Sequence, residues 1–383
     1  MTTKTFVHQF EPAHESPWRG SEIELTVQQI EAAGYLEMLQ SAGANLGSWS
    51  ILESLLQEGV PRFVFKQPLG LAREVKVAAS GLFGRFVARA YLTRYMGLCF
   101  FGHLGSRKVM LDGNELEIAR KKRSPGDLPD WVACASGLAN LTIAEAKGSH
   151  DPGGPRKRLK GAWKQAQRVD VLAAGKRLPV KRIAIVTRWA SASGGAKIPI
   201  IAVRDPVDPG DPDAPERLDE AAIGLARLHV ASLLEPLGFA PLADSIRSLL
   251  SGRRLRARDN ISGKRSRIEV ALTELDKIMP RRIAGAVESA EFNNEGLIGA
   301  LVTRAGPVPQ ADLAPSTVQI IRDLDLRPTF VGIEREVVRA VVAGDPDRIR
   351  KVTQRPRGSQ DPDVSTDAAG TWLAHVGERV HVE

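Results

Sequence analysis

The sequence predicts an α/β fold in its first half, followed by a mostly helical C-terminal region. Up to about residue 205, short apolar runs that are typical of buried strands alternate with longer helical patterns. A stretch rich in Pro and Asp then interrupts the chain at 206–216, where four prolines exclude a continuous helix or strand. Beyond this linker, the apolar spacing is largely helical.

The composition is that of a globular protein with a basic excess. The chain has 383 residues, 43% hydrophobic and 26% charged, which is enough for a full core and for more than one domain. Its net charge of +8 favours phosphate-bearing partners, because Lys and Arg gain affinity by displacing counterions from phosphates. Cys99 and Cys134 lie in apolar runs and are expected in the core rather than in a disulfide or a metal site.

No apolar run is long enough for a signal peptide or a membrane span. We therefore expect a cytoplasmic protein that has no membrane partner.

The first elements are a mixed segment over 1–60 and a long helix. Ser48 is expected to cap a short helix that ends near Leu56. Helical spacing of apolar residues predicts a helix over 72–98, in which Gly81 and Gly84 indicate a break or a close contact. A hairpin is then expected, with strands at 108–111 and 115–119 around the turn pair Asp112-Gly113.

Two apolar strands are predicted next, one beginning at Asp130 and one over 141–147 that Gly148 ends. A turn at 136–140 would join them as an antiparallel pair. The elements predicted after these strands are an amphipathic helix at 156–174, strands at 182–187 and 198–203, helices at 217–235, 241–252 and 333–343, and strand-like fragments near 266–272 and 328–332.

Asp130, Glu145 and Lys147 form the pattern that points to chemistry. Residues i and i+2 of a strand share a face, so Glu145 and Lys147 are expected to project together. The turn at 136–140 would bring the Asp130 carboxylate near that of Glu145. Charged groups in such apolar strands are costly to bury unless they are paired, and a divalent cation would pair them. A second Glu-x-Lys, at 74–76, lies in a helical setting and has no Pro-Asp before it.

Two carboxylates and a backbone carbonyl are hard oxygen ligands that suit Mg²⁺, with Mn²⁺ as an alternative. We therefore predict a metal site formed by Asp130, Glu145 and the carbonyl of Ala146. The metal would polarise a phosphoryl oxygen and activate a water, while Lys147 would offset the developing charge.

This arrangement resembles the PD-(D/E)xK nuclease superfamily, the fold of restriction endonucleases, through Pro129-Asp130 and Glu145-Ala146-Lys147. The order of elements over 72–203 is also similar to the αβββαβ core of that superfamily. The resemblance implies a DNA nuclease with Asp130 and Glu145 as metal ligands and Lys147 as the catalytic lysine. It also implies restriction, phage defence or repair as its setting.

Some branches of the superfamily have a supporting Gln on the helix after this strand. Gln165 or Gln167 would match that position here, and we take Gln165 as the site residue. Many members also carry an acidic residue on the first helix, where this sequence has Arg85. That departure favours a single metal over two.

Basic residues gather directly after the predicted site. Between Arg156 and Arg188 there are eleven Lys and Arg against one acid. On the predicted helix, the basic face is expected to contact nucleic acid, DNA rather than RNA. The residues of this face are Lys157, Lys160, Lys164 and Arg168.

Other interpretations use the same residues. Glu145 and Lys147 would equally suit an exposed pair at a strand end, and the basic residues would suit the solvated face of a helix. His150 would either touch a phosphate or be a loop residue without a role. The main alternative function is a non-catalytic protein that binds nucleic acid or another protein through a nuclease-like fold.

The predicted organisation has four parts. They are the mixed segment 1–60, a nuclease-like domain over 61–205, the linker 206–216 and the C-terminal region 217–383. The last of these is expected to contact substrate, or to mediate a homodimer or a contact with a partner protein.

Overall fold

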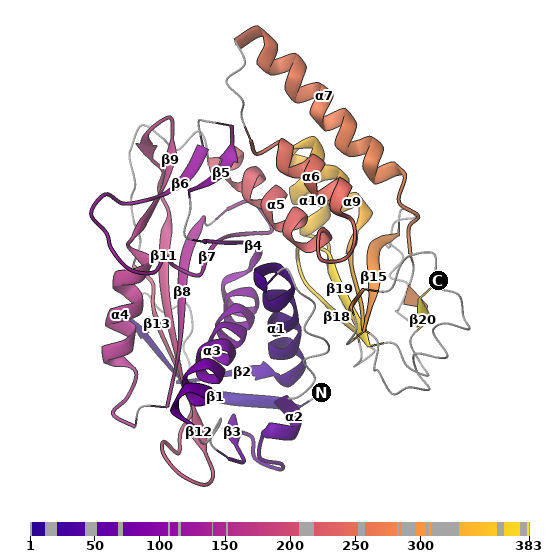
Figure 1. Ribbon diagram of the computed structural model, residues 1–383. Coiled ribbons are helices and arrows are strands. Elements are labelled where there is room, and N and C mark those ends of the chain that lie inside the picture. Colours follow the sequence, from indigo (N-terminus) through magenta and orange to yellow (C-terminus); the bar gives the residue numbers. More distant parts are fainter. Residues whose placement is uncertain are drawn as a thin grey trace.

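The fold is a mixed α/β arrangement in which helices cover both faces of a large sheet (Figure 1). In the computed structural model, the described residues are 2–11, 21–42, 52–67, 72–105, 108–113, 116–139, 141–150, 152–206, 218–251, 257–281, 283–284, 296–303, 306–307, 329–357, 364–375 and 381–382. None of the helices in these ranges is long and apolar enough to cross a membrane. The predicted linker 206–216 lies almost entirely outside them.

The central sheet has seven strands in the order β2-β1-β13-β11-β8-β7-β4. The pairs β4·β7 and β7·β8 are antiparallel, and β8·β11 is parallel. The connection from β8 to β11 begins with the helix α4 (Arg156–Ala166). The strands are β1 (Thr3–Glu11), β2 (Glu22–Thr26), β4 (Leu98–His103), β7 (Trp131–Ala135), β8 (Thr142–Ser149), β11 (Lys181–Arg188) and β13 (Ile200–Arg204).

Strand alternation explains why both faces of this sheet are apolar. Successive side chains of a strand point to opposite faces. On β11, Ile183 and Ile185 belong to the core under α3 (Arg73–Met96), whereas Ala184 and Val186 pack with Leu159 of α4. Both helices therefore bury apolar side chains against the same strand, one on each face.

The helix α3 confirms the prediction over 72–98, and it continues through Gly81 and Gly84 without a break. A Cβ on Gly84 would lie 2.5 Å from the backbone nitrogen of Gly148. Gly84 and Gly148 therefore allow the helix backbone to approach strand β8 closely. Gly148 does not end that strand, which continues to Ser149.

Several boundaries differ from the predictions. The hairpin β5 (Val109–Asp112) and β6 (Leu116–Arg120) forms, but it joins β9 (Val169–Ala173) and β10 (Lys176–Arg177) in a separate four-stranded sheet. Its place in the central sheet is taken by β4, for which no strand was predicted. The helix predicted over 156–174 ends at Ala166, because residues 169–173 pair with β6 as a strand.

The N-terminal segment shares the central sheet. Strand β1 pairs in parallel with β13, so the expected boundary at residue 61 is not a boundary between sheets. The helix α1 (Val27–Ala42) packs against α3. Small elements complete this part, namely α2 (Leu52–Leu55), β3 (Val64–Phe65) and β12 (Ala190–Ser191). The part of the short helix predicted at its start, 48–51, lies outside the described residues.

The C-terminal region contains the predicted helices together with a five-stranded sheet that was not predicted. The fragment expected near 328–332 belongs to this sheet, whereas 266–272 is helical. The helices are α5 (Leu218–Leu234), α6 (Ala240–Ser248), α7 (Ala257–Asp276), α9 (Arg335–Ala343) and α10 (Pro346–Thr353). The sheet consists of β16 (Gly306–Pro307), β15 (Leu297–Thr303), β17 (Thr329–Glu334), β19 (Thr371–His375) and β18 (Val364–Thr366), and β14 (Ile283–Ala284) pairs separately with β20 (His381–Val382).

The two parts share one apolar core. Helix α5 lies against strand β4 and helix α1 (Figure 1). Its buried leucines and alanines join the core of the five-stranded sheet. The C-terminal region is therefore built onto the edge of the central sheet at β4.

Candidate functional site

A cleft of about 760 Å³ opens between α3 and the end of β8. Asp130, Ala146 and Lys147 line it, together with residues from the first half of α3. Two of the three residues predicted to carry chemistry therefore face one open cavity, and the third, Glu145, is buried beside them. Concave sites of this size are where proteins commonly hold small ligands and reacting groups.

Asp130 and Glu145 are held together by the pairing of β7 with β8. Asp130 directly precedes β7, and its neighbour Trp131 pairs with Ala144, one residue before Glu145. The backbone N–H of Asp130 donates to Glu145 Oε2 (3.1 Å), and the N–H of Ala146 donates to Asp130 Oδ2 (2.8 Å). The antiparallel pairing that the sequence predicted thus brings the two carboxyl groups side by side.

Lys147 and Gln165 complete this cluster from the α4 side. Alternation along β8 directs Glu145 and Lys147 to the face that α4 covers, and Lys147 forms an ion pair with Glu145 Oε1. Lys147 Nζ donates to Gln165 Oε1 (2.9 Å), and Gln165 Nε2 donates to the carbonyl of Leu128 (2.7 Å). Of the two candidate glutamines, Gln165 is therefore the one in the site, whereas Gln167 is exposed at the end of α4.

Burial makes both carboxyl groups poor at carrying a negative charge. Desolvation and the neighbouring Asp130 raise the pKa of Glu145 well above its ordinary value. Desolvation also raises the pKa of Asp130, although the charge of Arg85 opposes that rise. Two desolvated carboxyl groups in contact favour a cation between them, because an opposite charge stabilises their ionised forms.

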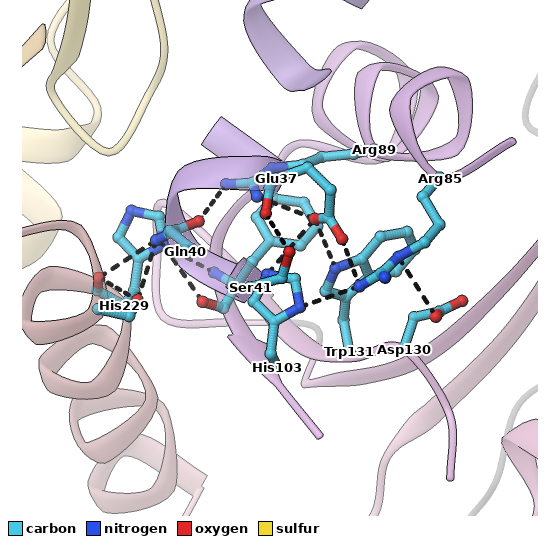
Figure 2. A network of polar contacts seen from close by, with 11 residues as sticks. Glu37, Gln40, Ser41, Arg85, Arg89, His103, Asp130, Trp131 and His229 are labelled. Carbon is cyan, nitrogen blue, oxygen red and sulfur yellow. Dashed lines mark hydrogen bonds and ion pairs between the residues drawn. The ribbon is translucent and has the colours of Figure 1, made fainter. Parts of the chain in front are cut away.

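Behind Asp130 lies a buried network of ion pairs that the sequence patterns did not predict (Figure 2). Arg85 Nε lies 3.4 Å from Asp130 Oδ1, and its Nη2 lies 2.5 Å from Glu37 Oε1. Glu37 comes from α1, is fully buried, and also pairs with Arg89 at 3.2 Å. Its Oε2 accepts a 2.9 Å hydrogen bond from the Trp131 indole.

Glu37 is relevant to Arg85, which stands where many superfamily members carry an acidic residue. An acidic side chain does reach this neighbourhood, but it comes from α1 rather than from α3. The sequence offered one signal for it, namely a Glu within the otherwise apolar run from Ala32 to Leu39. A buried charge is costly unless it is paired, so such a position favours a network residue.

The cations that face the cleft are Lys76, Arg85, Lys147 and Arg158. His150 also lines it, and burial lowers the pKa of its imidazole. The predicted nucleic-acid contacts lie elsewhere, three of them on α4 and Arg168 just after its end. Lys157, Lys160 and Lys164 are exposed and do not line the cleft, and Arg168 donates to the carbonyl of Asp127 at 2.6 Å. Lys76, in the Glu-x-Lys set aside as helical, was missed as a cleft residue.

The side chains present limit the number of ligands that the protein could offer to a metal ion. Within the described part of the chain, no group of three or more His, Cys, Asp and Glu side chains is placed to hold a metal ion. Asp130 and Glu145 are two carboxylates, so a cation there would need the Ala146 carbonyl, water or substrate oxygens as its remaining ligands. Mg²⁺ suits such a set, because it usually keeps several waters.

Comparisons of this chain with protein-family models, with curated proteins and with solved structures find no match.

Proposed function

We propose that this protein is a metal-dependent nuclease that hydrolyses DNA phosphodiester bonds. The observation that carries the proposal is the pair of desolvated carboxyl groups, Asp130 and Glu145, beside Lys147 at an open, basic cleft. Paired groups with strongly perturbed pKa values in a cleft are typical of functional sites.

The order of elements supports the same proposal. The elements α3, β4, β7, β8, α4 and β11 follow one another as helix, three strands, helix and strand, with strands of the small sheet inserted after β4 and after α4. This order resembles the αβββαβ core of the PD-(D/E)xK superfamily, with Asp130 directly before the second of these strands and Glu145-Ala146-Lys147 on the third. Restriction, phage defence and repair are the settings that this resemblance suggests.

In the proposed mechanism, Asp130, Glu145 and the carbonyl of Ala146 would hold one Mg²⁺, with Mn²⁺ as an alternative. A bound Mg²⁺ supplies Lewis-acid polarisation of the scissile phosphate. Lys147 places a positive charge next to the phosphoryl oxygens, where charge develops in the transition state. Gln165 fixes the position of the Lys147 ammonium by accepting its hydrogen bond, and it is itself held by Leu128.

The cleft also suits a phosphate backbone. Arg158 and Lys76 line it together with His150, and their charges add to the effect of burial in lowering the pKa of that imidazole. Cations spaced along a groove bind successive phosphates without reading the base sequence. The exposed lysines of α4 would extend this contact beyond the cleft.

The test is cleavage of plasmid and single-stranded DNA with Mg²⁺ or Mn²⁺. Lys147→Ala is expected to lower the cleavage rate by about 100-fold or more, because it removes a charge that acts in the transition state. The matched control is Lys277→Ala, which changes an exposed lysine directly after α7 and should leave cleavage as in wild type. DNA binding measured without divalent cation separates loss of chemistry from loss of affinity. Wild-type protein that binds DNA but cleaves it with neither ion would refute the proposal.

One observation favours the second candidate, a non-catalytic protein that binds nucleic acid through the same fold. Lys147 pairs with Glu145 and Arg85 pairs with Asp130, so the protein itself supplies a cation for each carboxylate. Mg²⁺ affinity distinguishes the two functions. A nuclease should bind Mg²⁺ in a way that Glu145→Gln abolishes, whereas a purely structural set of ion pairs should not bind it.

A further inference from the structure

A second cavity, of about 410 Å³, lies where α1 and α3 meet the C-terminal sheet. Its apolar lining includes Leu36 from α1, Ala90 from α3 and Phe101 from β4. Leu373 from β19 lines it from the C-terminal side. This volume lies within the range of cavities that hold small organic ligands, roughly 300–1,000 Å³.

The polar lining of this cavity has hydrogen-bonding groups that the fold does not use. In the described part of the chain, Arg94 makes no hydrogen bond or ion pair, and the hydroxyl groups of Thr93, Ser365 and Thr366 have no hydrogen-bond partner. Arg94 is exposed, and the three hydroxyl residues are partly exposed. The same cavity wall thus presents one guanidinium and three hydroxyl groups, which are donors that suit phosphate oxygens.

Two further arginines are fixed at the cavity by carboxylates that do not line it. Arg355 pairs with Glu336 at 2.6 Å, and Arg357 pairs with Glu334 at 2.7 Å. The acid that does line the cavity is Asp367, which accepts from the Thr371 N–H at 2.8 Å. The surface that a ligand meets therefore carries more positive than negative charge.

We propose that this cavity binds a phosphorylated ligand of nucleotide size. Arg94, Thr93 and the hydroxyl groups of β18 would receive the phosphate. The apolar wall at Leu36 and Ala90 would receive a planar or apolar group, and the Asp367 carboxylate would accept from a hydroxyl or amine of the ligand. The combination of an apolar wall with few, convergent polar groups is typical of ligand sites.

The cavity is connected to the cleft by charged groups in direct contact. Arg89 lines the cavity, pairs with Glu37 at 3.2 Å, and shares Glu37 with Arg85, which in turn contacts Asp130 at 3.4 Å (Figure 2). Arg89 is almost fully buried, and so is Glu37. A ligand phosphate near Arg89 would weaken its hold on Glu37, and Arg85 would then shift between Glu37 and Asp130. This regulatory step rests on the proposed nuclease function, whereas ligand binding does not.

AMP is the probe, and its binding is measured by calorimetry without divalent cation. Wild type is expected to bind AMP with a dissociation constant below about 1 mM, and to bind adenosine or inorganic phosphate more weakly. Arg94→Ala should weaken AMP binding about tenfold, because it removes a charge-assisted hydrogen bond. Arg73→Ala removes an exposed arginine from the same helix and should bind like wild type. Lys147→Ala should also bind like wild type.

Absence of saturable AMP binding to wild type would overturn the proposal, as would full affinity in Arg94→Ala. Loss of binding in Lys147→Ala would place AMP in the cleft instead and would overturn it too. For the regulatory step, AMP at saturation should change the rate of DNA cleavage at least threefold in wild type and not in Arg85→Lys. If AMP binds without changing the cleavage rate, the ligand site stands and the coupling is overturned. If wild type never cleaves DNA, only the nuclease function is refuted.

Discussion

Replacing Gly148 with Ala tests how closely α3 must approach the strand that carries Glu145 and Lys147. A Cβ built on Gly148 would lie 1.8 Å from the carbonyl oxygen of Ser80 and 2.6 Å from its carbonyl carbon. Both atoms belong to the helix backbone, so no side-chain rotation can relieve the overlap. The helix must move by more than 1 Å, roughly, to reach ordinary contact distance, and overpacking of this kind typically costs about 1–3 kcal/mol.

The matched control is Gly161→Ala on α4. Nothing lies within 4 Å of a Cβ at Gly161, which is exposed in a helix. Ala is favoured over Gly in a helix by about 0.5–1 kcal/mol, so this variant should be more stable than wild type. The same chemical change is thus expected to have opposite signs at the two positions.

The measurement is the free energy of unfolding from urea titration of the three proteins. Because Lys76 and Arg85 lie on the displaced helix, Gly148→Ala should also lower DNA cleavage under conditions where the protein remains folded. If Gly148→Ala unfolds at the same urea concentration as Gly161→Ala, then the inferred close contact between α3 and β8 at Gly148 is refuted.

Three other predictions concern pH, metal and positioning. Burial lowers the pKa of His229 to about 3, so this histidine takes up a proton less readily in the folded protein than in the unfolded chain. Its contribution to the free energy of unfolding is therefore fully present above pH 6.5 and is lost as the pH falls toward 3. Between pH 7.5 and pH 5, protonation of this histidine in the unfolded chain should lower the free energy of unfolding in urea by about 2 kcal/mol. His229→Gln should remove that part of the pH dependence, and an unchanged pH dependence in the variant would contradict the shift. Mg²⁺ at about 100 times its dissociation constant should stabilise wild type by about 2.7 kcal/mol in thermal unfolding, and Glu145→Gln should respond to Mg²⁺ no more than to Na⁺. Gln165→Ala should lower the cleavage rate about tenfold, less than Lys147→Ala, and a rate equal to wild type would show that the lysine needs no support.

The part of the site predicted from sequence is the part that local pairing determines. Asp130 and Glu145 are fifteen positions apart on two strands joined by a short turn, so strand geometry alone brings them together. Gln165 follows because α4 packs on the same strand. The network behind Asp130 was not predicted because Glu37 lies on α1, far from the site in the sequence, and no local pattern shows that this helix packs beside Asp130.

The fold errors have a similar origin. Residues 169–173 continue the apolar stripe of α4, and only their pairing with β6 makes them a strand. The run from Leu98 to Phe101 is continuously apolar, which does not distinguish a buried strand from the end of a buried helix. The strands at 297–303 and 371–375 depend on partners far away in sequence, so their local patterns gave no sign of a shared sheet.

The parallel pairing of β1 with β13 has a consequence for folding during synthesis. Val7 pairs with Ile200, so although β1 can pair early with the nearby β2 on one edge, its other edge has no partner until β13 has been made. Bringing such distant segments together carries a loop-closure cost and typically slows folding. Until then, β1 has an unpaired backbone edge, which is a site where strands of other chains can add. A partly synthesised chain therefore exposes this edge of β1 until residue 204 is available, and exposed strand edges of this kind favour aggregation.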